Sequence, residues 1–299
     1  MRLGVDLGGT KIEIIALEED GSVLLRERVP TPQSDYPATI EALADLVEAA
    51  EARLGRTGLP VGIGTPGAIS RASGLLKNSN SVCLNGQPLL RDLEARLGRT
   101  LRMSNDANCF ALSEAVDGAA AGAGVVFGVI IGTGTGAGIV VDGRVLTGPN
   151  AIAGEWGHNP LPWPRADELP GPDCYCGRQG CIETYLSGTG MARDFRQHTG
   201  EALSAESIVA RAEHGDPAGR AALERYHDRM ARALAHVINI LDPDVIVLGG
   251  GMGRIPTLYH EIPRRWGAYV FSDRVDTRLV APKHGDSSGV RGAAWLWPV

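Results

Sequence analysis

The sequence predicts an α/β protein of two similar lobes, each with the element order βββαβα, facing one another across a central cleft. The first observation is a repeated pattern of strands and turns. Residues 2–29 read as strand, Gly-Gly turn, strand, Asp-Gly turn and strand, and residues 124–148 repeat that order around the turn "IGTGTGAG". The second observation is helical apolar spacing after the first of these meanders. A structural duplication accounts for the repeat.

The first half of the chain carries two predicted helices. Residues 36–55 predict a helix that stops at Gly55, with an apolar face made of Ile40, Leu43, Leu46 and Val47. Residues 60–67 predict a short strand ending in a turn. The stretch "SNDANCFALSEAVDGAAAG" predicts a helix that is capped at its start and ends near residues 118–122.

The second half begins irregularly. Five prolines lie between Pro160 and Pro172, which excludes a regular helix or central strand there. Residues 227–241 predict a long helix, and residues 242–251 a buried strand ending in three glycines. We expect an N-terminal lobe of residues 1–117, with a C-terminal helix of about residues 286–299 packing back on it, and a C-terminal lobe of residues 118–285.

Composition excludes several classes of protein. The 299 residues include 29 basic and 35 acidic side chains, a net charge of −6, which disfavours nucleic acid as a partner. No apolar run is long enough for a membrane span and no leader is visible, so we expect a cytoplasmic protein without a membrane partner. Five cysteines, three of them clustered, do not resemble a disulfide framework.

The glycine-rich turns are candidate phosphate sites. In "DLGGTK" the glycines let backbone amides approach an anion, Thr10 adds a hydroxyl, and Asp6 is suited to hold Mg²⁺ through water. A Gly-Gly hairpin is equally typical of an ordinary tight turn. Neither these turns nor "LGGGMG" has the spacing of a P-loop or of a dinucleotide-binding fingerprint.

Six motifs in order, "DLGGTK", "SNDANC", "IGTGTGAG", "GEWGH", "CYCGRQGCIE" and "LGGGM", resemble the ROK family of bacterial sugar kinases and sugar-responsive repressors. The resemblance covers essentially the whole chain. It implies the actin-like, ribonuclease H-like ATPase fold, with ATP and Mg²⁺ at the glycine turns and a hexose beside them. Within the family, "NSNSVCLNGQPL" and "HGDSSGVRGAAWLWP" most resemble fructokinases that also accept mannose, and N-acetylglucosamine kinases and glucokinases are the alternatives.

The resemblance also implies roles for individual residues. Asp106 matches the catalytic base for the sugar 6-hydroxyl, although an Asn-Asp pair before a helix is also typical of an N-cap. The implied sugar contacts are Gly67, Asn80, Asn105, Asp106, Glu155, His158 and Glu183. The implied ATP and Mg²⁺ contacts are Asp6, Gly8, Gly9, Thr10, Lys11, Thr133, Gly134, Gly250 and Gly251.

The three clustered cysteines and one histidine form a Cys₃His set, a combination found in closed structural zinc sites. The set is His158, Cys174, Cys176 and Cys181. A redox pair is the poorer interpretation, because "CYC" lacks the two-residue spacing of that motif. In the family this spacing is the zinc site. Tyr175 stands where many relatives carry Gly, and we expect its side chain to point away from the ligand loop.

Two functions of other classes remain as alternatives. Repressors of the family carry an added helix-turn-helix domain, for which the first strand at Arg2 leaves no room. A sugar-binding protein without catalysis would need neither Asp106 nor the whole "DLGGTK" turn. The family also implies a homodimer.

Overall fold

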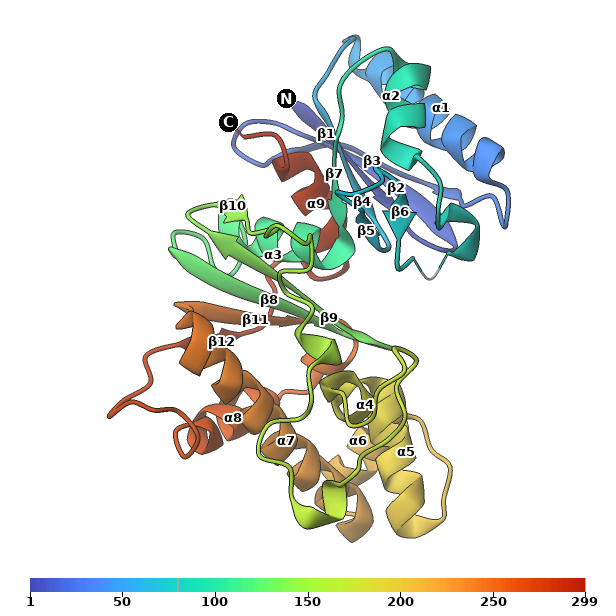
Figure 1. Ribbon diagram of the computed structural model, residues 1–299. Coiled ribbons are helices and arrows are strands. Elements are labelled where there is room, and N and C mark those ends of the chain that lie inside the picture. The colour runs from blue at the N-terminus through green and yellow to red at the C-terminus, as the bar shows by residue number, and fades with distance from the viewer. Residues whose placement is uncertain (80, 299) are drawn as a thin grey trace. The chain divides into compact units, whose positions relative to one another are not determined.

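The computed structural model in Figure 1 describes residues 1–79 and 81–298. Its contacts divide the chain into two compact units. Unit 1 consists of Met1–Gly122, Gly138–Ala153 and Lys283–Val299, and unit 2 of Ala123–Ala137 and Gly154–Pro282.

The sheet of unit 1 has the strand order β3-β2-β1-β4-β7. Its first three strands form the antiparallel meander, and the last two run parallel to β1. The strands are β1 (Arg2–Leu7), β2 (Lys11–Leu17), β3 (Val23–Pro30), β4 (Val61–Thr65) and β7 (Arg102–Asn105). A small hairpin joins β5 (Ala68–Ile69) to β6 (Leu76–Lys77).

Helices cover both faces of this sheet. Leu3, Val5 and Leu7 share a buried core with apolar residues of α1 (Tyr36–Leu54) and α2 (Leu89–Leu97). The intervening residues of β1 point to the other face, where α3 (Asp106–Val116) and α9 (Ser288–Trp295) lie (Figure 1).

The approach of α9 requires glycine in the sheet. A Cβ at Gly4 would lie 2.2 Å from the carbonyl oxygen of Val290, and one at Gly62 would lie 1.8 Å from that of Ala293. Any other residue would push the helix off the sheet.

The second sheet repeats the order of the first, as β10-β9-β8-β11-β12, with β11 parallel to both of its neighbours. Its strands are β8 (Val125–Ile131), β9 (Thr135–Val141), β10 (Arg144–Val145), β11 (Val245–Gly249) and β12 (Arg278–Val280). The helices of unit 2 are α4 (Ile182–Leu186), α5 (Gly188–Thr199), α6 (Ala205–Glu213), α7 (Pro217–Leu241) and α8 (Leu258–Trp266). The matching orders confirm the predicted duplicated α/β fold.

Two features differ from the sequence expectation. Helix α7 begins at Pro217, ten residues before the predicted start, because the side chain of Asp216 caps it by accepting a hydrogen bond of 2.8 Å from the amide of Gly219. Residues 118–122, 138–153 and 283–285 were expected in the C-terminal lobe but belong to unit 1. Gly138 makes that contact possible, because a Cβ there would lie 2.6 Å from the carbonyl oxygen of Ala107 on α3.

An ion-pair network anchors the proline-rich segment that precedes the cysteines. The buried carboxylate of Glu168 accepts hydrogen bonds from Arg229 at 2.8 Å and from Arg232 at 2.7 Å, both on α7. Burial alone would raise the pKa of Glu168, but the hydrogen bonds from Arg232 and from the Arg165 amide hold it at about 2. Arg232 also donates to the carbonyl oxygen of Trp163 at 2.8 Å, so the irregular chain is fixed to α7.

Candidate active site and metal site

Asp106 is the first residue of α3, directly after β7. Asn105 is the N-cap of this helix, because its side-chain oxygen accepts a hydrogen bond of 2.8 Å from the amide of Asn108. The capping function that the sequence also allowed for Asp106 is therefore filled by its neighbour. The Asp106 carboxylate accepts from the amide of Ala107 at 2.8 Å and remains accessible to solvent, while desolvation by the surrounding protein raises its pKa.

Asp6, at the end of β1, interacts electrostatically with Asp106. Desolvation is the largest cause of a pKa of about 6 for Asp6, and the negative charges of Asp106 and Glu13 raise it further, against the opposing effect of Lys11. Two carboxylates that repel one another are suited to bind a cation or to exchange a proton.

We expect Asp6→Asn to stabilise the ligand-free fold and impair catalysis. A folded-state pKa above the unfolded value means that ionised Asp6 destabilises the fold. This destabilisation is absent below about pH 4, grows as the pH rises from about 4 to about 6, and is complete above about pH 6. At pH 7.5 the neutral amide should raise the free energy of unfolding by about 1 kcal/mol. It should also lower kcat/KM for the phosphoryl transfer that the family resemblance implies, at least about tenfold. Thermal unfolding at pH 7.5 and pH 4 checks this, and an equal gain at both values would contradict it.

The "DLGGTK" turn presents exposed polar groups at the β1–β2 connection. The carbonyl oxygens of Gly8, Gly9 and Thr10 accept hydrogen bonds from Thr31 and Gln33 at 2.8 to 3.1 Å. The Gly8 amide donates to Lys11 within the hairpin, so it is not free for a phosphate as the sequence had suggested. The exposed groups of Gly9, Thr10 and Lys11 remain as candidates.

The second glycine turn, between β8 and β9, contacts the side chain of Glu183 at the start of α4. One carboxylate oxygen of Glu183 accepts a hydrogen bond of 2.8 Å from the amide of Thr135. A Cβ at Gly134 would lie 2.7 Å from the same oxygen, so the glycine allows the close approach. Thr133 is held to the start of α5 by the Thr189 hydroxyl, which donates to its carbonyl oxygen at 3.1 Å.

A cavity of about 730 Å³ opens beside this turn within unit 2. Thr133 and Gly251 line it, together with residues of α5, α6 and the turn after β11 that the sequence had not indicated, among them Ala205, Val209, Met252, Ile255 and Pro256. Its volume lies in the range of ligand pockets, about 300–1,000 Å³. The third glycine run lies next to this cavity. Gly250 adopts φ +78°, and a Cβ added there would lie 2.4 Å from the Ile131 carbonyl oxygen, so the position requires glycine.

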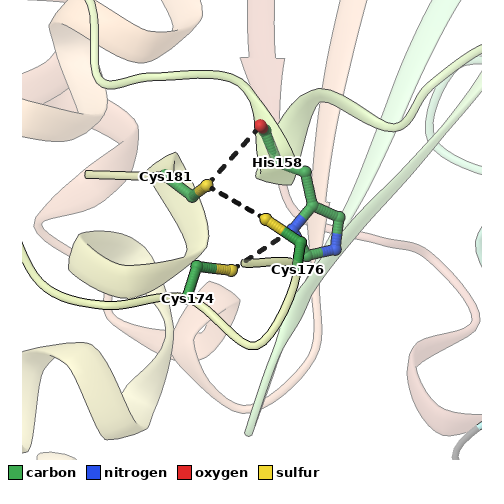
Figure 2. A group of neighbouring side chains, drawn as sticks. All are labelled: His158, Cys174, Cys176 and Cys181. Carbon is green, nitrogen blue, oxygen red and sulfur yellow. Dashed lines mark hydrogen bonds between the residues drawn. The ribbon is translucent and has the colours of Figure 1, made fainter. Parts of the chain in front are cut away.

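The structure brings His158, Cys174, Cys176 and Cys181 together (Figure 2). One ligand atom from each lies within 4.8 Å of all the others. The Sγ atoms of Cys176 and Cys181 are 3.6 Å apart, and Sγ of Cys174 is 3.5 Å from Nδ1 of His158.

These separations fit a tetrahedral zinc ion. Bonds of about 2.3 Å to sulfur and about 2.1 Å to nitrogen place two sulfurs about 3.8 Å apart, and sulfur and nitrogen about 3.6 Å apart. Burial raises the pKa of the Cys181 thiol to about 12, so a cation is needed to hold that side chain as a thiolate. The residues present therefore fit a structural zinc site.

The Tyr175 side chain reaches from the cysteine loop to His158. Its hydroxyl lies 2.9 Å from Nε2 of His158, and the two rings meet edge to face with centroids 5.1 Å apart. Desolvation and the negative charges of Glu183 and Glu155 raise the pKa of Tyr175 to about 12. Glu155 itself is exposed, three residues before His158.

The remaining predicted sugar contacts lie in unit 1. Gly67 follows β4 with φ +85°, and a Cβ there would lie 2.4 Å from the Lys77 carbonyl oxygen. Asn80 lies outside the described residues. The loop before it is fixed by Asn85, whose side-chain oxygen accepts from the Ser79 amide at 2.8 Å and whose side-chain amide donates to the Ser79 carbonyl at 2.8 Å. Sequence reasoning missed this role, since nothing in "CLNGQ" separates Asn85 from an ordinary turn residue.

Across the described residues, every helix is too short or too polar to cross a membrane.

Comparison with known proteins identifies the family. An N-acetyl-D-glucosamine kinase from Photobacterium profundum is 41% identical over 300 residues, covering 99% of both chains. The crystal structure of a ROK hexokinase from Thermus thermophilus superposes with a TM-score of 0.88 at 32% identity, covering 98% of this chain and 96% of the other. A ROK family glucokinase from Streptomyces griseus, in complex with glucose and AMPPNP, gives a TM-score of 0.76 at 27% identity and covers 99% and 98%. The profile of the ROK family matches residues 2–299, and the chain belongs to this family.

Proposed function

We propose that this protein, a sugar kinase of the ROK family, transfers the γ-phosphoryl group of ATP to the 6-hydroxyl of N-acetylglucosamine. The observation that carries the proposal is the full-length identity of 41% to an N-acetyl-D-glucosamine kinase. In addition, Asp106 is accessible at the start of α3 and does not serve as the N-cap of that helix. The relatives favour this sugar over fructose, which the motifs had suggested. Fructokinase activity therefore becomes the second candidate.

Asp106 is the proposed base. Phosphoryl transfer to an alcohol needs a group that orients the attacking hydroxyl and accepts its proton. A carboxylate at N1 of a helix is held as the anion by the helix dipole, while its raised pKa brings it closer to the working pH. Asp6 would hold the Mg²⁺ that accompanies ATP, and bound Mg²⁺ neutralises charge on the β- and γ-phosphates.

The other predicted residues divide between sugar and nucleotide. Glu155, His158 and Glu183 would receive the sugar hydroxyls, with Gly67, Asn80 and Asn105 as further contacts. For ATP, the exposed part of the "DLGGTK" turn would meet phosphate, while the cavity beside Thr133 and Gly251 has the size for the nucleoside. Of the predicted ATP residues, Gly8 would not bind phosphate through its amide, because that amide donates to the Lys11 carbonyl oxygen and so stabilises the turn.

The metal site is proposed to be structural zinc. Four protein ligands leave no open position for a substrate, so a Lewis-acid role in the reaction is disfavoured. The cluster instead ties the segment with Glu155 and His158 to the segment with Cys181 and Glu183. The second-candidate sugar, fructose, rests on the resemblance of "NSNSVCLNGQPL" and "HGDSSGVRGAAWLWP" to fructokinases.

A coupled ADP-release assay tests the proposed substrate. With ATP and Mg²⁺, we expect kcat/KM for N-acetylglucosamine to exceed the values for fructose, mannose and glucose at least tenfold, about 1.4 kcal/mol of transition-state preference. A lead for fructose would leave the kinase mechanism standing and replace the substrate. Activity on none of the four would overturn the proposed function. The homodimer stays a prediction, which light scattering on the purified protein checks.

A further inference from the structure

Unit 2 contains another cavity, which the proposed function does not use. It has a volume of about 260 Å³ and lies between the proline-rich segment, α4, α5 and α7. This volume is just below the range of typical ligand pockets, about 300–1,000 Å³, so the cavity suits a small ligand. Polar and charged side chains dominate its lining, among them Thr184, Arg193, Asp194, Gln197 and Arg229.

The two buried carboxylates of this lining are already paired with arginines of α7. Glu168 accepts hydrogen bonds from Arg229 at 2.8 Å and from Arg232 at 2.7 Å. Asp194 accepts them from Arg225 at 2.6 Å and from Arg229 at 2.7 Å. Burial opposes the ionisation of Asp194, but the hydrogen bond from Arg225 and the charge of Arg229 lower its pKa. Both carboxylates are therefore compensated, and neither is left to attract a cation.

The guanidinium of Arg193 has no carboxylate partner in the part of the chain that the structure describes. It donates a hydrogen bond to the backbone carbonyl oxygen of Thr184, and the remaining carboxylate of the lining, Asp167, is exposed. Desolvation by the surrounding protein lowers the pKa of Arg193, so its charged form costs free energy. A guanidinium has five N–H donors, and several of them remain for an anion.

Gln197 adds a second kind of donor, one turn further along α5. Residues four apart lie on the same face of a helix, and both Arg193 and Gln197 line the cavity. The side chain of Gln197 is exposed and makes no hydrogen bond to any described residue. A guanidinium and a carboxamide together suit an oxyanion. A phosphate group, which carries three acceptor oxygens and more charge, uses these donors more fully than a carboxylate does.

We propose that this cavity is an effector site for a small molecule that carries a phosphate group, held by Arg193 and Gln197. Arg193 connects the site to α4, because it donates to Thr184, the neighbour of Glu183. An anion that draws the guanidinium away from Thr184 removes this support of α4, and so weakens hexose binding at Glu183. Only this effect on the hexose rests on the proposed function; the phosphate site itself does not.

The test uses two variants and one control in the full-length, zinc-containing protein. Arg193→Gln removes the charge, and Gln197→Ala removes the amide of an exposed side chain. Arg196→Gln is the matched control, because it makes the same substitution at an exposed position of the same helix. Inorganic phosphate, glycerol 3-phosphate and uncharged glycerol are titrated calorimetrically into each protein, with AMPPNP and Mg²⁺ present to fill the nucleotide site. The Kd of the hexose that the wild type prefers is then measured with and without the phosphate compound.

We expect one equivalent of phosphate or of its ester, but not of glycerol, to bind the wild type and Arg196→Gln. Losing a charged hydrogen bond should weaken this binding at least about tenfold in Arg193→Gln, and losing a neutral one about threefold in Gln197→Ala. The saturating compound should raise the hexose Kd at least about fivefold in the wild type and not in Arg193→Gln. Tighter binding of inorganic phosphate would identify it as the effector, and tighter binding of glycerol 3-phosphate would identify a phosphate ester.

Equal phosphate binding by Arg193→Gln and the wild type would overturn the inference. Binding that depends on Arg193 but leaves the hexose Kd unchanged would overturn the effector role. A failure of the proposed function is distinguishable from both outcomes, because it appears in the wild-type activity on hexoses, whereas the calorimetric titration of phosphate requires no turnover.

Discussion

Asp106→Asn should lower kcat at least about a hundredfold, the range expected for losing a general base, while the Kd for the hexose stays within a few-fold. Asparagine keeps the size of the side chain and can still hydrogen-bond the attacking hydroxyl, but it cannot accept the proton. Helix α3 should be unaffected, because Asn105 supplies its cap. Steady-state kinetics and calorimetric titration of the hexose measure the two quantities.

The pH profile adds an independent readout. Because desolvation raises the pKa of Asp106, the kcat/KM of the wild type should fall on acidification at a higher pH than for an ordinary carboxyl group, and this limb should be absent from Asp106→Asn. Asp216→Asn is the matched control, since it makes the same substitution at the start of α7, where asparagine still caps. Wild-type turnover in Asp106→Asn would exclude the residue as the base.

Cys176→Ala should release the metal and damage the sugar site more than the nucleotide site. Removing one of three thiolates leaves too few ligands for a closed site, so zinc should fall from about one equivalent per chain to near zero. The KM for the hexose should rise at least about tenfold, the effect expected when the groups that orient a site are lost. The KM for ATP should stay within about threefold, because the cavity beside Thr133 is lined by α5, α6 and the turn after β11.

Cys83→Ala is the control for this experiment, because Cys83 is a free cysteine of unit 1 that is not part of the cluster. Metal content by mass spectrometry, and kinetics before and after chelation, measure the effect. Equal losses of hexose and ATP affinity in Cys176→Ala would mean that the metal holds the fold as a whole and has no special role at the sugar site.

The fold was predictable because its signals are local and repeated. Alternating strands, Asp-Gly turns and the stop at Gly55 reflect backbone chemistry that neighbouring residues determine. The close approach of α9 to the sheet was not predictable, since it depends on Gly4 and Gly62 meeting a helix more than 200 residues away in the sequence. The placement of residues 138–153 with unit 1 depends on a similar long-range contact at Gly138.

In the candidate site, too, some features could be predicted from the sequence and others could not. The Cys₃His set was readable because few other functions need those residue types together. The ambiguity at "SND" could be resolved only by the structure, which gives the cap to Asn105. The contact of Tyr175 with His158 was not predictable, because sequence spacing does not reveal that its hydroxyl can reach a residue 17 positions earlier in the chain.

The most direct test of the central claim is identification of the product. The wild-type protein is incubated with ATP, Mg²⁺ and N-acetylglucosamine, and the sugar phosphate is assigned by two-dimensional phosphorus–proton NMR. We predict coupling of the new phosphorus to the two protons on C6, with one ADP formed per sugar phosphate. Phosphate at any other carbon, or ADP formed without a sugar phosphate, would contradict the proposed reaction.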